Sequence, residues 1–233
     1  MKGHRVSRLY YFFILFLSSI APLGRCSESV QDLLKQPEKR IDVGIAALNL
    51  AKEIYPDIDI ASYSEKIDAL AEQVRRLARG SEDPDQRVRC LNTVLFLNEK
   101  FQAQRDPSFQ HKSENYYLNF VLDTKQGNCF SMPLLYVAVA QRIGWPIYIV
   151  HVPDHYFVRY VDPTFRQQNI EATSGGGYVP DEKYAEDFLV TEMGRKSGAY
   201  LRTLTYRELL ADLVATNAIT FGQQGQLPKA ISR

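Results

Sequence analysis

The sequence predicts an α+β protein, in which a helical N-terminal half precedes an apolar helix and a few antiparallel strands. Two observations support this fold class. Apolar residues recur every three or four positions between Ser29 and about Asn119, which is the spacing of amphipathic helices. After residue 146, β-branched and aromatic residues dominate two short runs at 147–152 and 156–161, as they do in strands. The composition, 45% hydrophobic and 24% charged, is that of an ordinary globular protein.

The helical region, residues 27–120, contains three apolar stripes at helical spacing. These stripes are Ile45, Leu48, Ala51 and Ile54; Ile67, Leu70, Val74 and Leu77; and Val88, Leu91, Val94 and Leu95. Pro56 separates the first two, because a proline disfavours helical backbone at the residue before it. Gly80 ends the second helix. The polar segment 102–117 is expected to be irregular. Stripes of this kind usually face a core, so we expect this region to be structural.

Residues 121–220 are expected to form the functional core. Its elements, in order, are an apolar helix over 134–143, strands over 147–152 and 156–161, a third strand over 168–173, a short helix over 181–188 and a final helix from Thr205. Thr205 and Glu208 have the spacing of a capping box. The tail, residues 221–233, is expected to be loose.

The first 26 residues have the pattern of an export signal. Basic residues precede the apolar stretch Leu9–Leu17, which is followed by small and helix-breaking residues up to Cys26. The stretch is shorter than the ~20 residues of a membrane span. We therefore expect cleavage after Cys26. The resulting protein would have no membrane span and would be located in the bacterial periplasm or secreted. The alternative is a lipid anchor at Cys26, in the manner of bacterial lipoproteins, although Arg25 is a poor fit beside the modified cysteine.

The charge balance argues against a nucleic-acid partner. Beyond the first 26 residues, which contain no acid, 24 of the 28 basic side chains remain against 27 acidic ones. A nucleic-acid-binding protein usually shows a basic surplus.

Beyond residue 26, Cys90 and Cys129 are the remaining cysteines. An exported protein could join them in a disulfide. Cys90 lies on the apolar side of an expected helix, so a buried free thiol is the simpler expectation.

Cys129, His155 and Glu171 have the residue types of a cysteine-nucleophile site. Cys129 is expected at the start of the apolar helix, His155 at the start of a strand and Glu171 on the next strand. A histidine beside a cysteine favours the reactive thiolate, and a carboxylate can orient the imidazole. Asn128 can cap the helix, whose first free N–H groups can hold an oxyanion. Pro133 falls slightly late for a helix capped at Asn128, so a helix that begins nearer Ser131 is the alternative.

The third member of the site is ambiguous in the sequence. Asn169 and Glu171 are two positions apart on the same expected strand, so both side chains lie on one face. Asp162 also follows His155, but a gap of seven residues is too short for a second strand to return. We read the segment Asp162-Pro163-Thr164 as a turn.

Three segments together resemble the cysteine, histidine and acidic boxes of the transglutaminase-like superfamily. They are Gly127-Asn128-Cys129, His155-Tyr156-Phe157-Val158-Arg159 and Glu171-Ala172-Thr173. The resemblance is closest to the small bacterial SirB-type proteins, whose pattern also includes Ala51-Lys52-x-x-Tyr55-Pro56, Arg142-Ile143-Gly144-Trp145-Pro146 and Pro153-x-His155. It covers about residues 40 to 215. The chain departs from the pattern at Glu171, where aspartate is usual, and at Asp154, where glycine is common.

The resemblance implies a papain-like α+β core and chemistry at an amide of a peptide or protein through a thioacyl intermediate. Peptide hydrolysis, deamidation and amine transfer are the possible outcomes. Cys129, His155 and Glu171 would be the catalytic residues, and Gln126 a further candidate for oxyanion support. Many SirB-type members lack the cysteine, so its presence in this chain favours activity. The alternative is a catalytically inactive binding or scaffold module that uses the cleft for a peptide partner.

A zinc site is the competing enzymatic interpretation. His151 and His155 are four residues apart, which suits two ligands on one helical face. Their surroundings are strand-like and contain Pro153, which removes that geometry, so we expect no metal. The sequence contains no phosphate loop or dinucleotide fingerprint, so no cofactor is expected either. It does not specify the oligomeric state.

Overall fold

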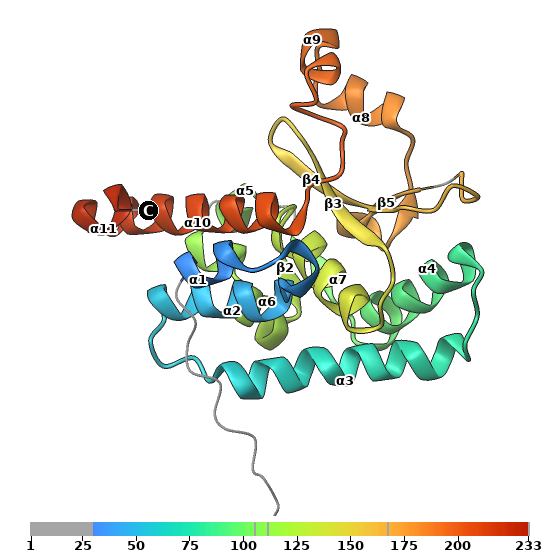
Figure 1. Cartoon of the computed structure of the whole chain (residues 1–233), viewed down its shortest axis with the longest axis horizontal. Helices are drawn as coiled ribbons and strands as arrows, with labels where there is room; N and C mark the ends of the chain where they lie inside the picture. The colour runs from blue at the N-terminus through green and yellow to red at the C-terminus, as the bar shows by residue number, and fades with distance from the viewer. Residues whose placement is uncertain (1–29, 105, 111, 167, 233) are drawn as a thin grey trace, which may run out of the picture.

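The structure is a computed structural model that describes residues 30–104, 106–110, 112–166 and 168–232 (Figure 1). The expected export signal, including Cys26, lies outside the described residues. Within the described ranges, no helix is long and apolar enough to span a bilayer.

The N-terminal part is helical, as the periodicity predicts. Its helices are α1 (Val30–Lys35), α2 (Val43–Ile54), α3 (Ile60–Ala78), α4 (Pro84–Asn92) with a π-helical continuation over Thr93–Asn98, α5 (Pro107–Gln110) and α6 (Leu118–Thr124). The side chains of Asp42, Asp59 and Asp83 accept backbone N–H groups at the starts of α2, α3 and α4, as N-caps do. The segment 102–117, expected to be irregular, contains only short elements.

The functional half consists of helix α7 and a four-stranded antiparallel sheet. Helix α7 covers Ser131–Arg142, and the strands are β3 (Ile147–Val152), β4 (His155–Tyr160), β5 (Asn169–Glu171) and β6 (Gly177–Tyr178), in the order β3-β4-β5-β6. A separate parallel pair joins β1 (Gln102–Ala103) to β2 (Gln126–Gly127). The fold class predicted from the sequence, α+β, is confirmed.

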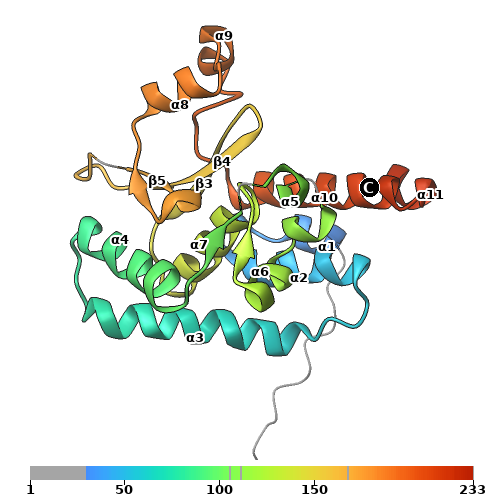
Figure 2. The same ribbon diagram turned by 180° about the vertical axis from the view of Figure 1, so that it is seen from behind.

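The two faces of the sheet are covered by different helices (Figures 1 and 2). Val158 and Tyr160 belong to the main core, which includes the buried side of α7. Phe157, which directly precedes Val158, points to the other face and packs in a small second cluster with Tyr184 of α8 (Asp181–Asp187). This alternation follows from the period of two along a strand. It places α8 and the following α9 (Glu192–Lys196) as an arm on the face opposite α7.

One hydrophobic core runs through both halves of the chain. It includes Leu33 of α1, Val74 of α3 and Leu135 of α7, and extends to Leu213 near the C-terminus. The boundary expected near residue 120 therefore does not separate two cores. Polar contacts strengthen the join: the Gln141 side chain accepts the N–H of Val43 (2.8 Å) and donates to the carbonyl of Ile41 (2.8 Å).

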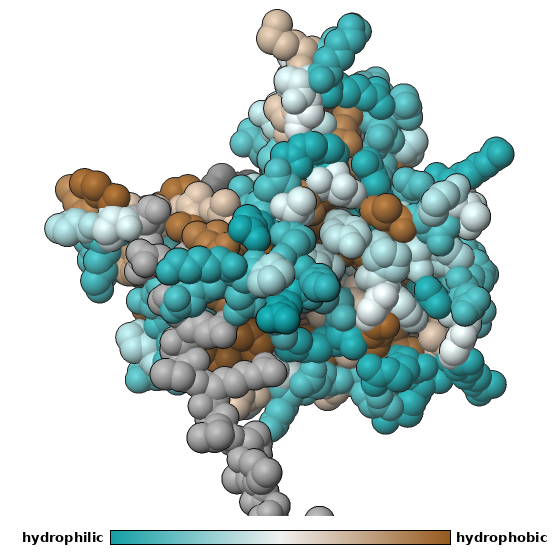
Figure 3. Space-filling view, viewed as in Figure 1, coloured by the Kyte–Doolittle hydropathy of each residue, from teal (hydrophilic) through white to brown (hydrophobic). Residues whose placement is uncertain are grey.

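The C-terminal segment differs from the expectation of a loose tail. Helix α10 covers Tyr206–Gln223, and α11 covers Leu227–Ile231. Glycine and proline disfavour helix, and this segment contains Gly222, Gly225 and Pro228. Pro228 nevertheless lies in the first turn of α11, where its missing N–H costs little. Apolar side chains are exposed at this end, where brown surface gathers at one extremity of Figure 3; they include Ile219, Leu227 and Ile231.

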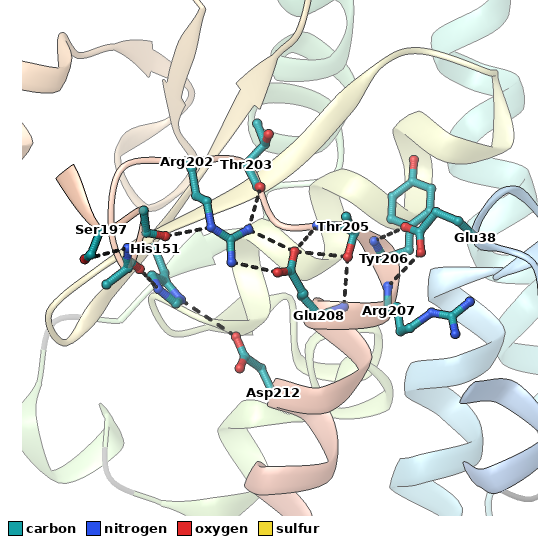
Figure 4. Close-up of polar contacts among 12 residues, drawn as sticks. Glu38, His151, Ser197, Arg202, Thr203, Thr205, Tyr206, Arg207, Glu208 and Asp212 are labelled. Atoms are coloured by element: carbon teal, nitrogen blue, oxygen red, sulfur yellow. Dashed lines mark hydrogen bonds and ion pairs between the residues drawn. The ribbon is translucent and has the colours of Figure 1, made fainter. Parts of the chain in front are cut away.

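The start of α10 is capped from two directions (Figure 4). Thr205 and Glu208 form the capping box that their spacing predicts. In addition, the carboxylate of Glu38 accepts the backbone N–H groups of Tyr206 and Arg207, the latter at 3.4 Å. Glu38, which follows α1, thus stabilises the positively polarised N-terminus of α10.

Candidate active site

Cys129 lies in the turn immediately before α7. Helix α7 begins at Ser131, so the interpretation with a later helix start is correct. The buried Asn128 side chain holds this turn: its Oδ1 accepts the N–H groups of Phe130 and Ser131, both at 3.0 Å, and the Ser131 hydroxyl at 3.1 Å. The Asn128 Nδ2 is buried and has no partner among the described residues.

The backbone donors around Cys129 are almost all in use. Asn128 Oδ1 accepts the backbone N–H groups of Phe130 and Ser131, and the Asn128 carbonyl accepts the N–H of Met132 at 3.1 Å. Pro133 has no N–H to give. The expectation that the first turn has several free donors is therefore wrong, because the asparagine that caps the turn consumes them. In this stretch of the described residues, the backbone N–H of Cys129 is the one that has no hydrogen-bond acceptor.

The Cys129 thiol faces the turn between β3 and β4. Its Sγ lies 3.8 Å from the carbonyl oxygen of Asp154. Asp154 adopts a left-handed conformation with φ +57°. That conformation favours glycine but is tolerated by aspartate, which explains why glycine is common at this position in the pattern that the chain resembles.

His155 and Glu171 form a buried hydrogen-bonded pair. The His155 Nε2 lies 2.7 Å from Glu171 Oε2, and both side chains are about nine-tenths buried. This hydrogen bond occupies Nε2 and leaves Nδ1 for another partner, and the Cys129 thiol is near enough to the ring to help raise its pKa. The carboxylate is fully engaged, because Oε1 accepts the Thr173 N–H (2.8 Å) and hydroxyl (2.6 Å) and Oε2 accepts the Tyr184 hydroxyl (2.9 Å).

The electrostatics favour a charged pair. Burial disfavours the imidazolium of His155, but the hydrogen bonds and charges of Cys129 and Glu171 outweigh it and raise the pKa of His155 to about 9. Burial likewise opposes the charged form of Glu171, yet its bonds to His155 and Thr173 leave the pKa of this carboxyl lowered. The geometry thus stabilises an imidazolium next to the thiol, and the carboxylate that orients it stays ionised.

The other candidates from the sequence lie in different places. Asn169 is on the same face of β5 as Glu171, but its Oδ1 accepts from Arg159 Nε (2.6 Å) and its Nδ2 donates to Asp181 (2.7 Å). Glu171, and not Asn169, is the residue that contacts His155. Gln126 is on β2, half-buried, and does not line the cavity at Cys129. Asp162 accepts the N–H and hydroxyl of Thr164, so that segment is a turn, as expected.

A cavity of about 1010 Å³ opens at Cys129. Aromatic side chains form much of its wall: Tyr116, Phe130, Tyr156 and Tyr200, with Asp212, Ala215, Thr216 and Ile219 of α10 opposite. Tyr116 lines this cavity together with Cys129, and burial raises the pKa of its phenol. The sequence analysis missed Tyr116 and Tyr156, since isolated tyrosines carry no periodic signal.

His151 contributes to the cavity wall rather than to the Cys129 site (Figure 4). Its Nε2 donates to the carbonyl of Ala199 at 2.6 Å, and Nδ1 lies 3.9 Å from Asp212 Oδ2. The nearby Asp212 carboxylate raises the pKa of His151, because it favours the charged imidazolium. No group of three His, Cys, Asp or Glu side chains in the described ranges is arranged to hold a metal ion.

Both cysteines within the described part of the chain are free. Cys90 is buried in the main core, as expected, and burial raises the pKa of its thiol. Cys129 is half-exposed and lies on the cavity. The two thiols therefore differ in exposure, and only Cys129 lies close to an imidazole among the described residues.

The chain resembles several curated proteins over part of its length. The UPF0162 protein of Xylella fastidiosa is 28% identical over 113 residues, which are 48% of this chain and 40% of that protein. The F-box only protein 21 of Pongo abelii is 28% identical over 124 residues, 45% of this chain and 20% of the relative, and that of Mus musculus is 34% identical over 71 residues, 30% and 11% respectively. The chain thus spans less than half the length of these relatives. No solved structure matches it significantly.

A family model described as "Transglutaminase-like superfamily" matches residues 61–214, from the start of α3 to within α10. The matched range contains the Cys129 turn, the His155–Glu171 pair and the strands and helix that carry them. A domain of this kind supports a cysteine-based acyl-transfer or hydrolase function. Because the match covers well over half of the sequence, the chain belongs to the transglutaminase-like superfamily.

Proposed function

We propose that this protein is a cysteine enzyme that acts on amide bonds of a peptide or protein through a thioacyl intermediate. The observation that carries the proposal is the position of His155: its ring bonds Glu171 through Nε2, and it directly follows Asp154, whose carbonyl oxygen is 3.8 Å from Cys129 Sγ. A nucleophile, a base and an orienting acid in hydrogen-bonding sequence are the arrangement that nucleophilic catalysis requires.

The reaction follows from this arrangement in two steps. The Cys129 thiolate attacks the amide carbonyl carbon, and the carbonyl electron pair moves to oxygen. When the C–N bond breaks, the amine leaves with the proton of the His155 Nδ1, and a thioester remains. Water or a second amine then attacks the thioester, loses a proton to His155, and the C–S bond breaks to restore the thiolate.

The backbone N–H of Cys129 is the best-supported donor for the oxyanion. The neighbouring N–H groups are bonded within the turn, so only this one is available to a ligand among the described residues. Asn128 supports it indirectly by fixing the turn. The phenol of Tyr116, on the cavity wall near the thiol, is a second candidate donor, while Gln126 is not placed at the cavity.

The shape of the cavity fits a peptide segment better than a small metabolite. About 1010 Å³ of space, open to solvent and lined by aromatic rings and by one face of α10, leaves room for side chains on both sides of a scissile amide. The acyl group passes to water or to an amine, depending on which of these nucleophiles reaches the thioester.

We also propose that the protein acts outside the cytoplasm. The support is the sequence pattern of residues 1–26 described above. Expression of the full chain in a bacterial host, followed by fractionation and N-terminal sequencing, tests this. A periplasmic or secreted product that begins after Cys26 supports cleavage; a lipid on Cys26 supports the anchor; a cytoplasmic protein that retains residues 1–26 overturns the proposal.

The decisive experiment for the chemistry is the pH dependence of iodoacetamide alkylation, with Cys129 and Cys90 followed separately by peptide mass spectrometry. Cys129 should label fast at mildly acidic pH, and His155→Ala should slow it, because the imidazolium that favours the thiolate is lost. Cys90, buried and without such a neighbour, is the internal control. Equal rates at the two cysteines, or no effect of His155→Ala, would refute the enzyme and favour a binding module that uses the same cleft.

A further inference from the structure

We propose that Phe188 and Tyr184, on the arm that follows the sheet, are positioning residues for the His155–Glu171 pair. The inference rests on the proposed function, since it assigns to the arm a part in the same site. Neither residue belongs to the cysteine, histidine or acidic segments, and the sequence analysis gave the helix at 181–188 no role.

Phe188 covers the imidazole. Its ring is stacked on the ring of His155, with centroids 4.5 Å apart and planes inclined by only 5°. Phe188 is half-buried and packs at the edge of the second cluster, next to Tyr184. Its presence over the ring keeps water from that face of His155, where water would compete for the hydrogen bond to Glu171.

Tyr184 holds the acid. Its hydroxyl donates to Glu171 Oε2 at 2.9 Å, the same oxygen that accepts from His155 at 2.7 Å. The Tyr184 ring is stacked on Phe157 of β4, with centroids 3.7 Å apart and planes inclined by 5°. A ring locked in this way presents its hydroxyl to the carboxylate in a single direction, so the carboxylate cannot rotate away from the imidazole.

The backbone at the end of α8 fixes both side chains. The N–H of Phe188 donates to the carbonyl of Tyr184 (3.1 Å), and that of Val190 to Ala185 (2.9 Å). Leu189, between them, takes a left-handed conformation with φ +52° and exposes 83% of its side chain. The chain thus turns sharply just after Phe188, and the turn keeps Phe188 over the histidine.

The start of α8 is anchored to the same strand that carries the acid. Asp181 accepts from Asn169 Nδ2 (2.7 Å) and from Arg159 Nη2 (2.5 Å). Asn169 and Glu171 lie on one face of β5, so one strand holds the arm at two points: through Asp181 at its start and through Tyr184 one turn later. Asn169, the rejected candidate for the third catalytic residue, therefore acts in the anchoring of the arm.

Four variants and one control test this inference in the full chain. Phe188→Ala removes the covering ring, Phe188→Leu keeps apolar bulk without a flat face, Phe188→Trp restores a flat ring, and Tyr184→Phe removes the hydroxyl alone. Leu189→Ala, next to Phe188 but exposed, is the matched control. Urea unfolding of each variant confirms that it is folded before its site is compared.

The first readout is the imidazole N–H resonance of His155 by NMR, assigned with His155→Gln. We expect a slowly exchanging signal in the wild type that is retained in Leu189→Ala and Phe188→Trp and is lost by exchange in Phe188→Ala, with Phe188→Leu intermediate. A residue that only stabilises the fold would not change exchange at this single nitrogen in a folded variant. A signal unchanged in folded Phe188→Ala overturns the role of Phe188.

The second readout is the pH profile of Cys129 alkylation. Phe188→Ala should lower the rate below pH 7 roughly tenfold, as expected for a misplaced catalytic group. Tyr184→Phe should move the acidic limb of the profile to higher pH, because Glu171 loses a hydrogen-bond donor and is protonated more easily. A profile identical to that of the wild type overturns the role of Tyr184.

The two levels of inference fail in different ways. If the wild type shows no fast alkylation at Cys129, the proposed function fails and so does the inference built on it. If the wild type alkylates fast and depends on His155, while Phe188→Ala and Tyr184→Phe behave as Leu189→Ala does, the enzyme stands and the positioning role of the arm is excluded.

Discussion

Gly176 lies so close to Asn92 that no side chain fits between them: a Cβ atom at Gly176 would be 2.0 Å from Asn92 Oδ1. The Asn92 Nδ2 donates to the Gly176 carbonyl (2.9 Å), and the Gly176 N–H donates to the carbonyl of Glu171 (3.0 Å). Tyr136 of α7 completes the group by donating to Asn92 Oδ1 at 3.0 Å. Through this contact, α4 and α7 hold the turn that follows the acid of the candidate site.

Gly176→Ala should therefore destabilise the protein by about 2–4 kcal/mol, because the methyl group overlaps Asn92 and the backbone has φ +81°. Gly175→Ala is the control: its φ of +72° is similar, but the space beside it is open, so we expect a loss of about 1 kcal/mol. Urea unfolding measures both. Equal losses would show that backbone strain, and not the contact with Asn92, sets the cost.

Glu171→Gln should lower the pKa of His155. The amide keeps the size of the carboxylate but not its charge, which is one of the causes that hold the pKa of His155 at about 9. NMR titration of the imidazole gives the value directly. Glu192→Gln, on the exposed surface of α9, is the control and should leave the titration unchanged. An unaltered pKa in Glu171→Gln would mean that the carboxylate does not act on His155.

The stability supplied by His155 should disappear at alkaline pH. Its pKa is higher in the folded protein, about 9, than the ordinary 6.5, so its contribution is complete below the ordinary value and is lost as the pH rises through about 9. The difference in unfolding free energy between wild type and His155→Gln should thus be larger at about pH 6 than at about pH 10, by at most about 3 kcal/mol at ~1.4 kcal/mol per unit of pKa.

The same measurement on Cys129→Ala separates the two partners of His155. That variant removes the thiol that helps to raise the pKa of His155, while Glu171 remains. The alkaline loss of stability should therefore begin at a lower pH than in the wild type. A loss at the same pH in both proteins would assign the raised pKa to Glu171 alone.

Asn128→Asp should fold but alkylate slowly. An aspartate can still accept the three bonds from Phe130 and Ser131 that hold the turn, and it lacks the unpartnered Nδ2. Its negative charge beside Cys129 disfavours the thiolate. Asn128→Ala, which loses all three bonds, should instead cost roughly 1–2 kcal/mol of stability. Faster alkylation in Asn128→Asp would contradict the charge argument.

The sequence predicts the elements of this fold well where one periodic signal dominates. The strand at 147–152 has the bounds expected for it, and the capping box of Thr205 and Glu208 begins α10 as predicted. The Cys129, His155 and Glu171 positions also meet as their order suggests. Each of these depends on local spacing or on a strand order that admits few arrangements.

Contacts made across the sheet could not be predicted in this way. Periodicity says that Phe157 and His155 share a face, but not that a helix beginning at 181 returns to cover that face. The stacking of Phe188 on His155 and the choice of Glu171 over Asn169 both depend on that return. At the C-terminus, α11 forms although it contains Pro228, because this proline falls in the first turn, where it is tolerated.

The cap that Glu38 provides to α10 has a consequence for biosynthesis. A ribosome completes the segment that contains Glu38 well before Tyr206 emerges, so this cap can form only after the intervening residues have been made. Cys129, His155, Glu171 and the arm that covers them all precede α10. The reactive groups are therefore synthesised first, and the cleft gains the wall formed by α10, with Asp212 and Thr216, only after them.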